Sequence, residues 1–302
     1  MHFAILCSRD SWYLADLRRA AADRHEITPV AFRDLAAELT GSGPKFTSGQ
    51  VDLERVDALL VRTMPPATLE QVVFRMDVLG RLEAAGKWVI NPPRAIEAAV
   101  DKYLASAKLA AAGLLTPHTF ICQTADQALS AFERLGGDVV VKPLFGAEGR
   151  GISRLVDEAL AQRAFSLLTG LGAVLYVQRF IPHDGYDLRV LVVGSRMWAM
   201  RRRNPLDWRT NVSRGARAEA VELEPQWAEL ARRAAACIGA PLAGIDLLPG
   251  RDGRTYVLEV NAVPGWQALS RTLRVDVARC VLDYLESLVE SGRDEAKETE
   301  RP

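Results

Sequence analysis

Short apolar runs alternate with longer segments of helical periodicity over the N-terminal third of the chain. Runs with the length and residue types of strands occupy 2–8, 27–32, 56–64 and 88–91. Helical periodicity occupies 12–24 and 68–86, and we expect a short helix after Asp34 and a loop at 41–50. Such alternation predicts a small doubly wound α/β sheet. No G-x-G-x-x-G motif follows the first run, so a dinucleotide site is not supported.

A second strand-and-helix unit follows an alanine-rich helix expected at 94–113. Strands are predicted at 119–123, 138–144, 152–157 and 174–181, with helices at 124–135 and 158–169. The loop FGAEGRG joins two of these strands, whereas a Walker loop needs GK[ST] before a helix. Its glycines would let backbone N–H groups approach phosphate oxygens; they are Gly146, Gly149 and Gly151.

Lys142 lies in the apolar strand directly before this glycine loop. A buried lysine usually needs an anionic partner, which favours a phosphate group next to it. The alternative is that the side chain extends along apolar surface and places its ammonium group in water.

Two hairpins are predicted in the C-terminal third. The first spans 187–203 and turns at Gly194-Ser195, and a polar loop separates it from a helix at 224–238. The second spans 242–265 and precedes a closing helix at 274–289. The tail 291–302 is charged and poor in apolar residues, so we expect it to be disordered.

The second hairpin carries a candidate metal site. If Asp252-Gly253 forms a two-residue turn, counting outward places Asp246 opposite Glu259. Glu259 and Asn261 are two residues apart, so on a strand they share a face. Two carboxylates and an amide oxygen suit magnesium or manganese. A one-residue slip would move Asp246 to the other face, and the alternative is two carboxylates exposed to water.

Arginine is concentrated after the first hairpin, with seven arginines between Arg196 and Arg217. We expect three that flank Asn211 to bind phosphate or carboxylate, namely Arg203, Arg209 and Arg214. The alternative is that they pair with nearby acidic residues, namely Asp184, Asp187, Asp207 or Glu219. Nucleic acid is not expected as a partner, because only Trp198 and Trp208 could stack on bases.

Composition adds a few constraints. The 302 residues are 49% hydrophobic and 25% charged, and Lys+Arg and Asp+Glu both number 38. This balance does not favour a polyanionic partner. The four cysteines are dispersed in apolar runs, which predicts reduced thiols and a cytoplasmic protein. The N-terminus does not resemble a signal peptide, and no apolar run approaches the roughly 18 residues of a membrane span.

Seven motifs, in order, resemble the ATP-grasp superfamily and, within it, the RimK-type α-L-glutamate ligases. They are Asp101-Lys102, 142–151, 177–181, 187–194, 209–215, 243–248 and 258–265. The resemblance covers 1–285 and implies an α/β ATP-grasp fold with an N-terminal Rossmann-like preATP-grasp domain. The implied domains are 1–93 (preATP-grasp), 94–183 (central) and 184–290 (C-terminal), with a disordered tail at 291–302.

The resemblance also implies a role for individual residues in binding ATP between the last two domains. Lys102 and Lys142 contact its phosphates, and 146–151 forms a mobile lid. The adenine hinge consists of Gln178, Arg179, Phe180 and Ile181, and Asp187 contacts the ribose. Two magnesium or manganese ions are held by Asp246, Glu259 and Asn261. One departure is Arg179, because the family usually has glutamate at that hinge position.

The implied reaction is amide-bond formation through an acyl phosphate. A carboxylate attacks the γ-phosphate of ATP, and an amine then attacks the acyl carbon and displaces phosphate. Positioning and charge neutralisation supply most of the catalysis in phosphoryl transfer. We expect Arg203 and Arg209 to neutralise the acyl phosphate, and we group Asn211 with them.

Charge favours L-glutamate as the amine, because Arg203, Arg209 and Arg214 leave cationic donors beyond those that ATP would occupy, and a dicarboxylate offers two anions to them. The FGAEGRG loop and the arginine-rich segment favour a small tetrahydromethanopterin-like coenzyme as the carboxylate acceptor. The alternatives are a ribosomal-protein C-terminus, a carrier-protein glutamate as in LysX-like enzymes, or a nucleotide-binding module without catalysis. We expect a cytoplasmic homo-oligomer that has neither nucleic acid nor a membrane as a partner.

Overall fold

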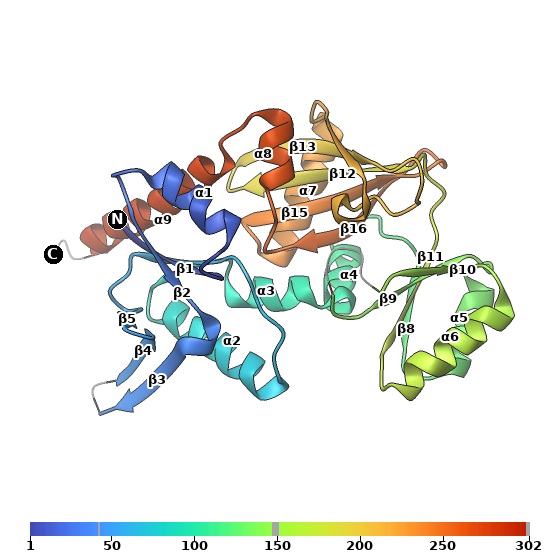
Figure 1. Cartoon of the computed structure of the whole chain (residues 1–302), viewed down its shortest axis with the longest axis horizontal. Helices are drawn as coiled ribbons and strands as arrows, with labels where there is room; N and C mark the ends of the chain where they lie inside the picture. Colours follow the sequence, from blue (N-terminus) through green and yellow to red (C-terminus); the bar gives the residue numbers. More distant parts are fainter. Residues whose placement is uncertain (42, 147–150, 300–302) are drawn as a thin grey trace.

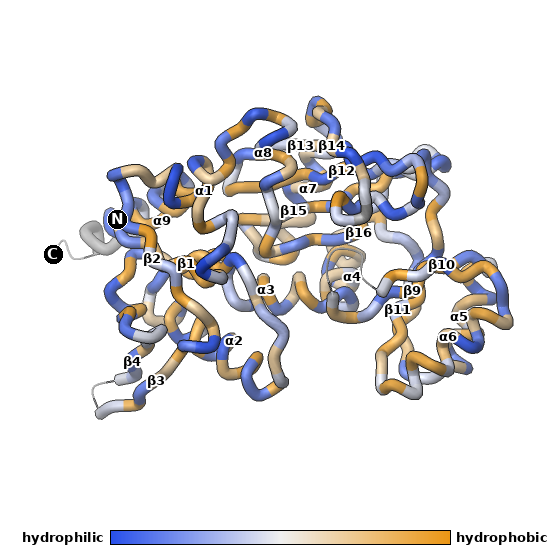
Figure 2. The backbone as a smooth tube through the Cα atoms, in the orientation of Figure 1, coloured by the Kyte–Doolittle hydropathy of each residue, from blue (hydrophilic) through white to orange (hydrophobic). Residues whose placement is uncertain are grey.

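The computed structural model describes residues 1–41, 43–146 and 151–299, which form three β-sheet bodies (Figure 1). The N-terminal sheet is parallel, with strand order β2-β1-β6-β7. Its strands are β1 (His2–Leu6), β2 (Glu26–Val30), β6 (Ala58–Val61) and β7 (Trp88–Ile90), joined through helices α1 (Trp12–Ala21) and α2 (Leu69–Ala84). The four predicted strands and the two longer predicted helices of this body are confirmed, and hydrophobic positions run along β1 (Figure 2).

A small antiparallel sheet replaces the short helix expected after Asp34 and the loop expected at 41–50. A 3-10 turn at Phe32–Asp34 leads into β3 (Leu35–Thr40), which pairs with β4 (Gly43–Ser48) and then β5 (Val51–Asp52). Both expectations were wrong because strand pairing outweighed the helical preference of the LAAEL segment. Ser42, within the expected loop, lies outside the described residues.

The alanine-rich helix is two helices, α3 (Pro93–Val100) and α4 (Lys102–Ala111), so the single helix predicted at 94–113 was wrong. Asp101 interrupts it, because its carboxylate accepts hydrogen bonds from the backbone N–H groups of Tyr103 (2.8 Å) and Leu104 (3.1 Å). This is N-capping, which favours the start of a new helix. The break places Lys102 at the first position of α4, where its side chain can reach the glycine loop.

The central sheet is antiparallel, with order β10-β9-β11-β8. Its strands are β8 (Thr119–Cys122), β9 (Val139–Pro143), β10 (Ser153–Leu155) and β11 (Leu175–Arg179). Helices α5 (Ala125–Arg134) and α6 (Glu158–Gly170) cover one face (Figure 1), where Val139, Val141 and Val177 join an apolar core. Residues on the other face alternate with these and include Lys142, Tyr176 and Gln178.

The C-terminal sheet has five strands in the order β14-β13-β12-β15-β16. They are β12 (Tyr186–Val193), β13 (Arg196–Arg203), β14 (Arg217–Ala220), β15 (Leu242–Pro249) and β16 (Thr255–Asn261). Helix α7 (Pro225–Ile238) packs on one face with Leu188, Val190 and Ile245. On the other face, Leu191 and Leu242 share a core with the N-terminal sheet, α1 and α9 (Val277–Thr299).

The C-terminal end of the chain is helical further than the sequence suggested. Helix α8 (Gln267–Leu273) precedes α9, which continues to Thr299 instead of ending at 289. The disordered tail predicted at 291–302 was therefore wrong as far as Thr299, and residues 300–302 lie outside the described residues. Arg293 binds Asp57 of the N-terminal body, with Nη2 2.6 Å from Oδ1. No helix within the described ranges is long and apolar enough to span a membrane.

Candidate active site

The β15–β16 hairpin pairs Asp246 with Glu259, as predicted. The predicted two-residue turn was wrong, because Pro249 pairs with Thr255 and the Gly250 N–H donates to the Arg254 carbonyl (2.8 Å). This turn alone would shift the register by one residue. An irregularity between Asp246 and Leu247 absorbs one extra residue in β16 and restores the pairing.

Asp246 belongs to a buried group of charges on one face of the C-terminal sheet. Arg202 Nε lies 2.7 Å from Asp187 Oδ1, and Arg202 Nη2 lies 2.9 Å from Asp246 Oδ2. Arg189 Nε lies 2.7 Å from Asp246 Oδ1. Only 2% of Asp187, 4% of Arg202 and 5% of Asp246 is exposed. On the same face, these buried charges lie beside the apolar residues that pack on the N-terminal body, including Leu191 and Leu242.

The charges in this group perturb one another. Burial raises the pKa of Asp187, although the Arg202 guanidinium opposes the shift. Burial acts to lower the pKa of Arg202, but the charges of Asp187 and Asp246 outweigh it and the pKa is raised. The carboxylate of Asp187 is therefore occupied by Arg202, and this geometry does not support the expected ribose contact.

Arg202 and Arg189 were not singled out from the sequence, and Arg203 was expected in their place. Arg203 points to the opposite face of β13, where its Nε lies 3.7 Å from Glu219 Oε1 and its guanidinium lies 5.2 Å from the Tyr186 ring centroid. This orientation places Arg203 away from Asp187 and Asp246, so it lends no support to the expected catalytic role. Counting outward from the Gly194-Ser195 turn places Arg202 opposite Asp187, and that signal could have identified it.

The polar loop after β13 supplies a further arginine. Arg209 Nη2 lies 2.6 Å from Asp207 Oδ2, and Arg209 Nη1 donates to the Ile152 carbonyl at 3.4 Å, which links the loop to the strand after the glycine loop. Asn211 directly precedes a 3-10 turn at Val212–Arg214. In the structure, Arg203 pairs with Glu219 and Arg209 pairs with Asp207. Both pairs correspond to the alternative in which these arginines bind nearby acidic residues.

Lys142 lies on the uncovered face of the central sheet within a polar network. Its ammonium group donates to Gln178 Oε1 (2.7 Å), and Gln178 Nε2 donates to Thr119 Oγ1 (2.9 Å). The Tyr176 hydroxyl lies 3.2 Å from Gln178 Nε2 and 2.7 Å from Ser106 Oγ on α4. This network fixes the orientation of Lys142, and it contains no acidic side chain among the residues that the structure describes.

Lys102 approaches the same region from α4. Its ammonium group donates to the Gly146 carbonyl at 2.9 Å. Burial lowers the pKa of Lys142 to about 8 and also lowers that of Lys102, whereas the Glu259 charge raises both. The two lysines and Glu259 therefore lie in one another's electrostatic field, although they come from three separate segments. Gly146 and Gly151 have positive φ angles (+149° and +71°), and Gly149 lies outside the described residues.

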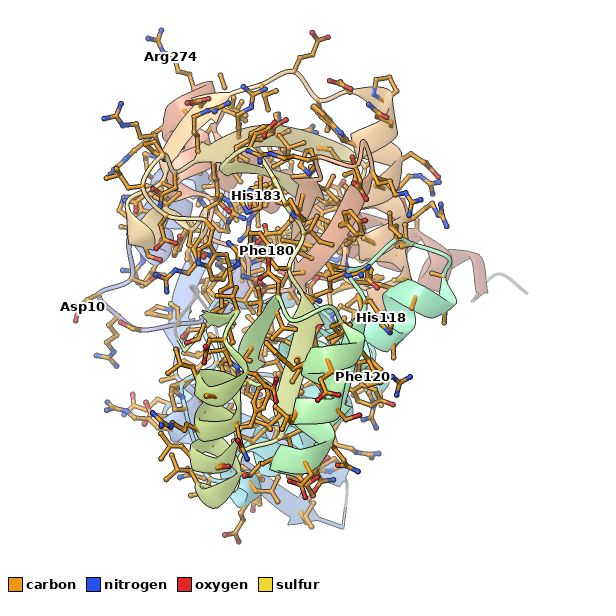
Figure 3. The ribbon with its side chains drawn as sticks, turned by 90° about the vertical axis from the view of Figure 1, so that its right-hand side faces the viewer. Asp10, His118, Phe120, Phe180, His183 and Arg274 are labelled. Carbon is orange, nitrogen blue, oxygen red and sulfur yellow. The ribbon has the colours of Figure 1, made fainter. Side chains whose placement is uncertain are left out.

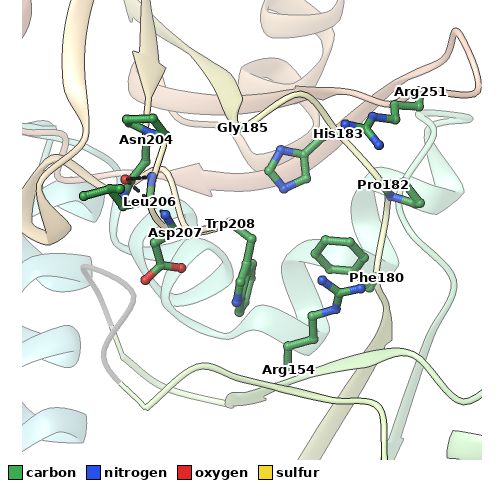
Figure 4. Close-up of a pocket in the computed structure, with 11 residues that line it drawn as sticks. Arg154, Phe180, Pro182, His183, Gly185, Asn204, Leu206, Asp207, Trp208 and Arg251 are labelled. Carbon is green, nitrogen blue, oxygen red and sulfur yellow. Dashed lines mark hydrogen bonds between the residues drawn. The ribbon is translucent and has the colours of Figure 1, made fainter.

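The hinge residues Gln178–Ile181 connect the central and C-terminal sheets, and Figure 3 shows Phe180 at this junction. Next to it is a pocket of about 430 Å³ (Figure 4). The Arg154 guanidinium lies 3.6 Å from the Phe180 ring centroid, and the Trp208 ring meets Phe180 edge-on at 5.8 Å. These flat groups form walls that suit a planar ligand. Other lining residues include His183, Asp207 and Arg251.

Two other hinge side chains point away from this pocket. The Arg179 Nε donates to the Leu135 carbonyl at 3.4 Å, on the side covered by α5. Ile181 packs against Leu248 and Tyr256 of the β15–β16 hairpin. The arginine that replaces the family's usual glutamate therefore has a partner outside the pocket. Trp208 and His183 line the pocket but were not predicted, since both occur in irregular segments without periodicity.

The residues at the β15–β16 hairpin fit a hard divalent cation. Asp246 Oδ1 is buried and has no hydrogen bond of acceptable geometry, although Arg189 Nε is close to it. Such an atom can accept a further ligand. The donor set consists of two carboxylates and the Asn261 amide, all oxygen donors. No group of three or more His, Cys, Asp or Glu side chains suited to a metal occurs among the described residues, so Asn261 is needed to complete the set.

Known proteins resemble this chain in sequence and in architecture. The RimK-like ATP-grasp domain family matches residues 99–285. The chain is 34% identical over 291 residues to a tetrahydromethanopterin:alpha-L-glutamate ligase of Methanosarcina acetivorans, covering 86% of this chain and 89% of that protein. It is 31% identical over 299 residues to a probable alpha-L-glutamate ligase of Picosynechococcus, covering 97% and 98%.

A solved structure of the ATP-grasp ligase PsnB with a minimal precursor has a TM-score of 0.77 at 23% identity, covering 94% of this chain and 98% of that chain. At this identity the likeness establishes the fold alone, and it agrees with the arrangement of sheets described above. The family match extends over more than half of the chain and includes both lysines and the β15–β16 hairpin. The chain therefore belongs to the RimK-like ATP-grasp family, and it is an ATP-dependent ligase that joins a carboxylate to an amine.

Proposed function

We propose that the protein adds L-glutamate to a carboxylate group of a small coenzyme-like acceptor, in the manner of a tetrahydromethanopterin:alpha-L-glutamate ligase. The observation that carries the proposal is similarity to glutamate ligases along nearly the whole chain. The placement of the charges supports it, because Lys142 of the central sheet lies in the electrostatic field of Glu259 and Asp246 of the C-terminal sheet. The charge of Arg203 and Arg209 does not add support, since each has an acidic partner.

We propose that the phosphates of ATP lie beside Lys102 and Lys142, both of which donate only to neutral oxygens in the contacts described above. The Phe180–Trp208 pocket is proposed to receive the adenine ring, with backbone groups of the hinge reading its edge. The glycine loop would then cover the phosphates, consistent with the link between Lys102 and Gly146.

We propose that Asp246, Glu259 and Asn261 hold two magnesium ions, with manganese as a substitute. When bound, these ions would neutralise phosphate charge. Arg202 and Arg189 lie on the same face of the sheet and are proposed to stabilise the negative charge that develops on the transferred phosphoryl group. Asp187 would then position Arg202, because it holds the guanidinium by two hydrogen bonds.

The test measures ADP release and product mass for the purified protein with Mg-ATP. Candidate carboxylate acceptors are combined in turn with glutamate, aspartate, glutamine and lysine, and a peptide ending in glutamate represents a protein acceptor. The proposal predicts turnover with glutamate and a pterin-like acceptor, with a product heavier by one glutamyl residue. Turnover with another amine would contradict it, and ATP binding without any turnover would favour the non-catalytic alternative.

Three further properties are proposed and can be tested separately. We propose domain boundaries near residues 93 and 183, which limited proteolysis would test. A homo-oligomer is proposed, which light scattering after size-exclusion chromatography would test. The four free cysteines support a reducing compartment such as the cytoplasm.

A further inference from the structure

Arg62 is a buried cation that the proposed mechanism does not use. It follows β6 directly, and only 6% of its surface is exposed. Its Nη2 donates to the Pro264 carbonyl at 2.6 Å, whereas Nε and Nη1 are buried without a hydrogen-bond partner. These two atoms carry three of the five N–H donors of a guanidinium group, one on Nε and two on Nη1. Within the described ranges, no carboxylate forms an ion pair with Arg62.

Two aromatic rings hold the guanidinium group in place. Its central carbon lies 4.2 Å from the Trp266 ring centroid and 4.7 Å from that of Tyr13. Trp266 is itself anchored, because its indole N–H donates to Asp16 at 2.9 Å. Stacking stabilises a cation but leaves its in-plane N–H donors unused. Burial lowers the pKa of Arg62 to about 10, and only Tyr13 and Cys7 oppose the shift.

The position of Arg62 in the sheet is the second observation that points to a ligand. The strand order β2-β1-β6-β7 reverses direction between β1 and β6, because β1 leads through α1 to β2 on one side and β6 leads through α2 to β7 on the other. Ligands of open α/β sheets bind outside the carboxyl ends of the strands at such a switch point. Arg62 occupies this position in a sheet that has no glycine-rich phosphate loop.

Arg62 is also close to the proposed reaction centre. Pro264, which accepts its hydrogen bond, is three residues after Asn261, so their Cα atoms are at most about 11 Å apart. An anion held by Arg62 would therefore lie near the metal-binding hairpin, on the side that faces the N-terminal body. The region around Arg62 is tightly packed in this structure, because the Tyr13 hydroxyl lies 2.5 Å from where a Cβ at Gly265 would be. Ligand entry therefore requires local opening of the segment around Tyr13 and Gly265.

We propose that Arg62 is the anchor for a substrate carboxylate, which it binds with the N–H donors left free by Pro264. The proposal rests on the proposed ligase function and adds a substrate-binding role for the N-terminal body. A guanidinium group binds a carboxylate through two parallel hydrogen bonds, which fixes orientation as well as charge. The carboxylate could belong to the incoming glutamate or to a non-reacting carboxylate of the acceptor.

The experiment compares Arg62→Lys and Arg62→Met with the parent protein. A matched control is Arg75→Lys, because Arg75 is equally buried (6% exposed) and also donates to a backbone carbonyl, that of Pro65, at 3.0 Å. The Michaelis constants for glutamate, acceptor and ATP are measured separately, together with the dissociation constant of Mg-ADP. We expect Arg62→Lys to raise the KM of one carboxylate substrate by about 10-fold or more, with Mg-ADP binding unchanged. Arg75→Lys should leave all three KM values unchanged.

The substrate whose KM rises identifies the source of the carboxylate. If only kcat falls, or if Mg-ADP binding weakens as well, Arg62 is structural and the proposal is overturned. A direct titration with glutamate and with glutarate, in the presence of a non-hydrolysable ATP analogue and magnesium, keeps the proposal testable without turnover. Binding of either acid by the parent and its loss in Arg62→Met would support the anchor. Equal binding of the acids by the parent and by Arg62→Met would overturn the proposed anchor. A parent protein that is active but rejects glutamate as the amine would overturn only the proposed function.

Discussion

Replacing Lys142 by methionine should change how protein stability depends on pH. Burial lowers the pKa of Lys142 from 10.5 to about 8, and 2.5 pKa units correspond to about 3 kcal/mol. This is the approximate cost of keeping the charged lysine in the unliganded protein at neutral pH. Methionine removes that cost but leaves the Gln178 amide oxygen without its donor, which costs about 1–3 kcal/mol. The two effects nearly cancel at pH 7.

They do not cancel at high pH. A lysine with a depressed pKa in the folded state binds fewer protons there than in the unfolded chain between pH 8 and pH 10.5. Parent stability therefore gains about 1.4 kcal/mol per pH unit across this range, and Lys142→Met lacks this gain. The free energy of unfolding, measured by urea denaturation without nucleotide or metal, should fall for Lys142→Met relative to the parent by about 2–3 kcal/mol between pH 7.5 and 10. A difference between the two proteins that does not change with pH would refute the reasoning.

Three other variants test separate parts of the site. Arg202→Lys should lower kcat by about 100-fold or more, because it loses the bidentate contact with Asp187. The kcat of Arg203→Lys should stay within about twofold of the parent. Equal effects of the two substitutions on ADP release would contradict the assignment of the two side chains to opposite faces of β13. Glu259→Gln should abolish the magnesium dependence of ATP binding while circular dichroism stays unchanged, and a normal magnesium titration would remove Glu259 from the metal site. Asp101→Ala should lower the free energy of unfolding by about 1 kcal/mol through the lost helix cap, and an unchanged denaturation midpoint would show that the cap is not needed.

Local patterns in the sequence determined most of the elements and the chemistry of the hairpin. Alternation along 255–261 places Glu259 and Asn261 on one face, and a strand reproduces that alternation wherever it lies in the fold. The alternating runs of the N-terminal third likewise specify strands and helices, because periodicity depends on neighbours in the chain. The motif order was specific enough to indicate the family before any sheet was assembled.

Contacts between distant segments decided which of these residues can act together. The LAAEL segment after Asp34 became a strand because β4 was available to pair with it. Arg202 and Arg203 are adjacent residues of the same type, so residue type does not distinguish them. The register of β12 against β13 buries Arg202 beside Asp187 and turns Arg203 toward Glu219.

The β15–β16 hairpin shows the same division. The sequence predicted that Asp246 faces Glu259, but it could not reveal that a longer turn and an irregular pairing offset each other. Arg62 is the clearest case of a feature that only the tertiary structure decided. Nothing beside it in the sequence marks it as special, and its unused donors arise because Tyr13, Trp266 and Pro264 surround it from other parts of the chain. Burial is a property of the assembled fold, so a charge that lacks a partner can be recognised only after the sheets and helices have packed together.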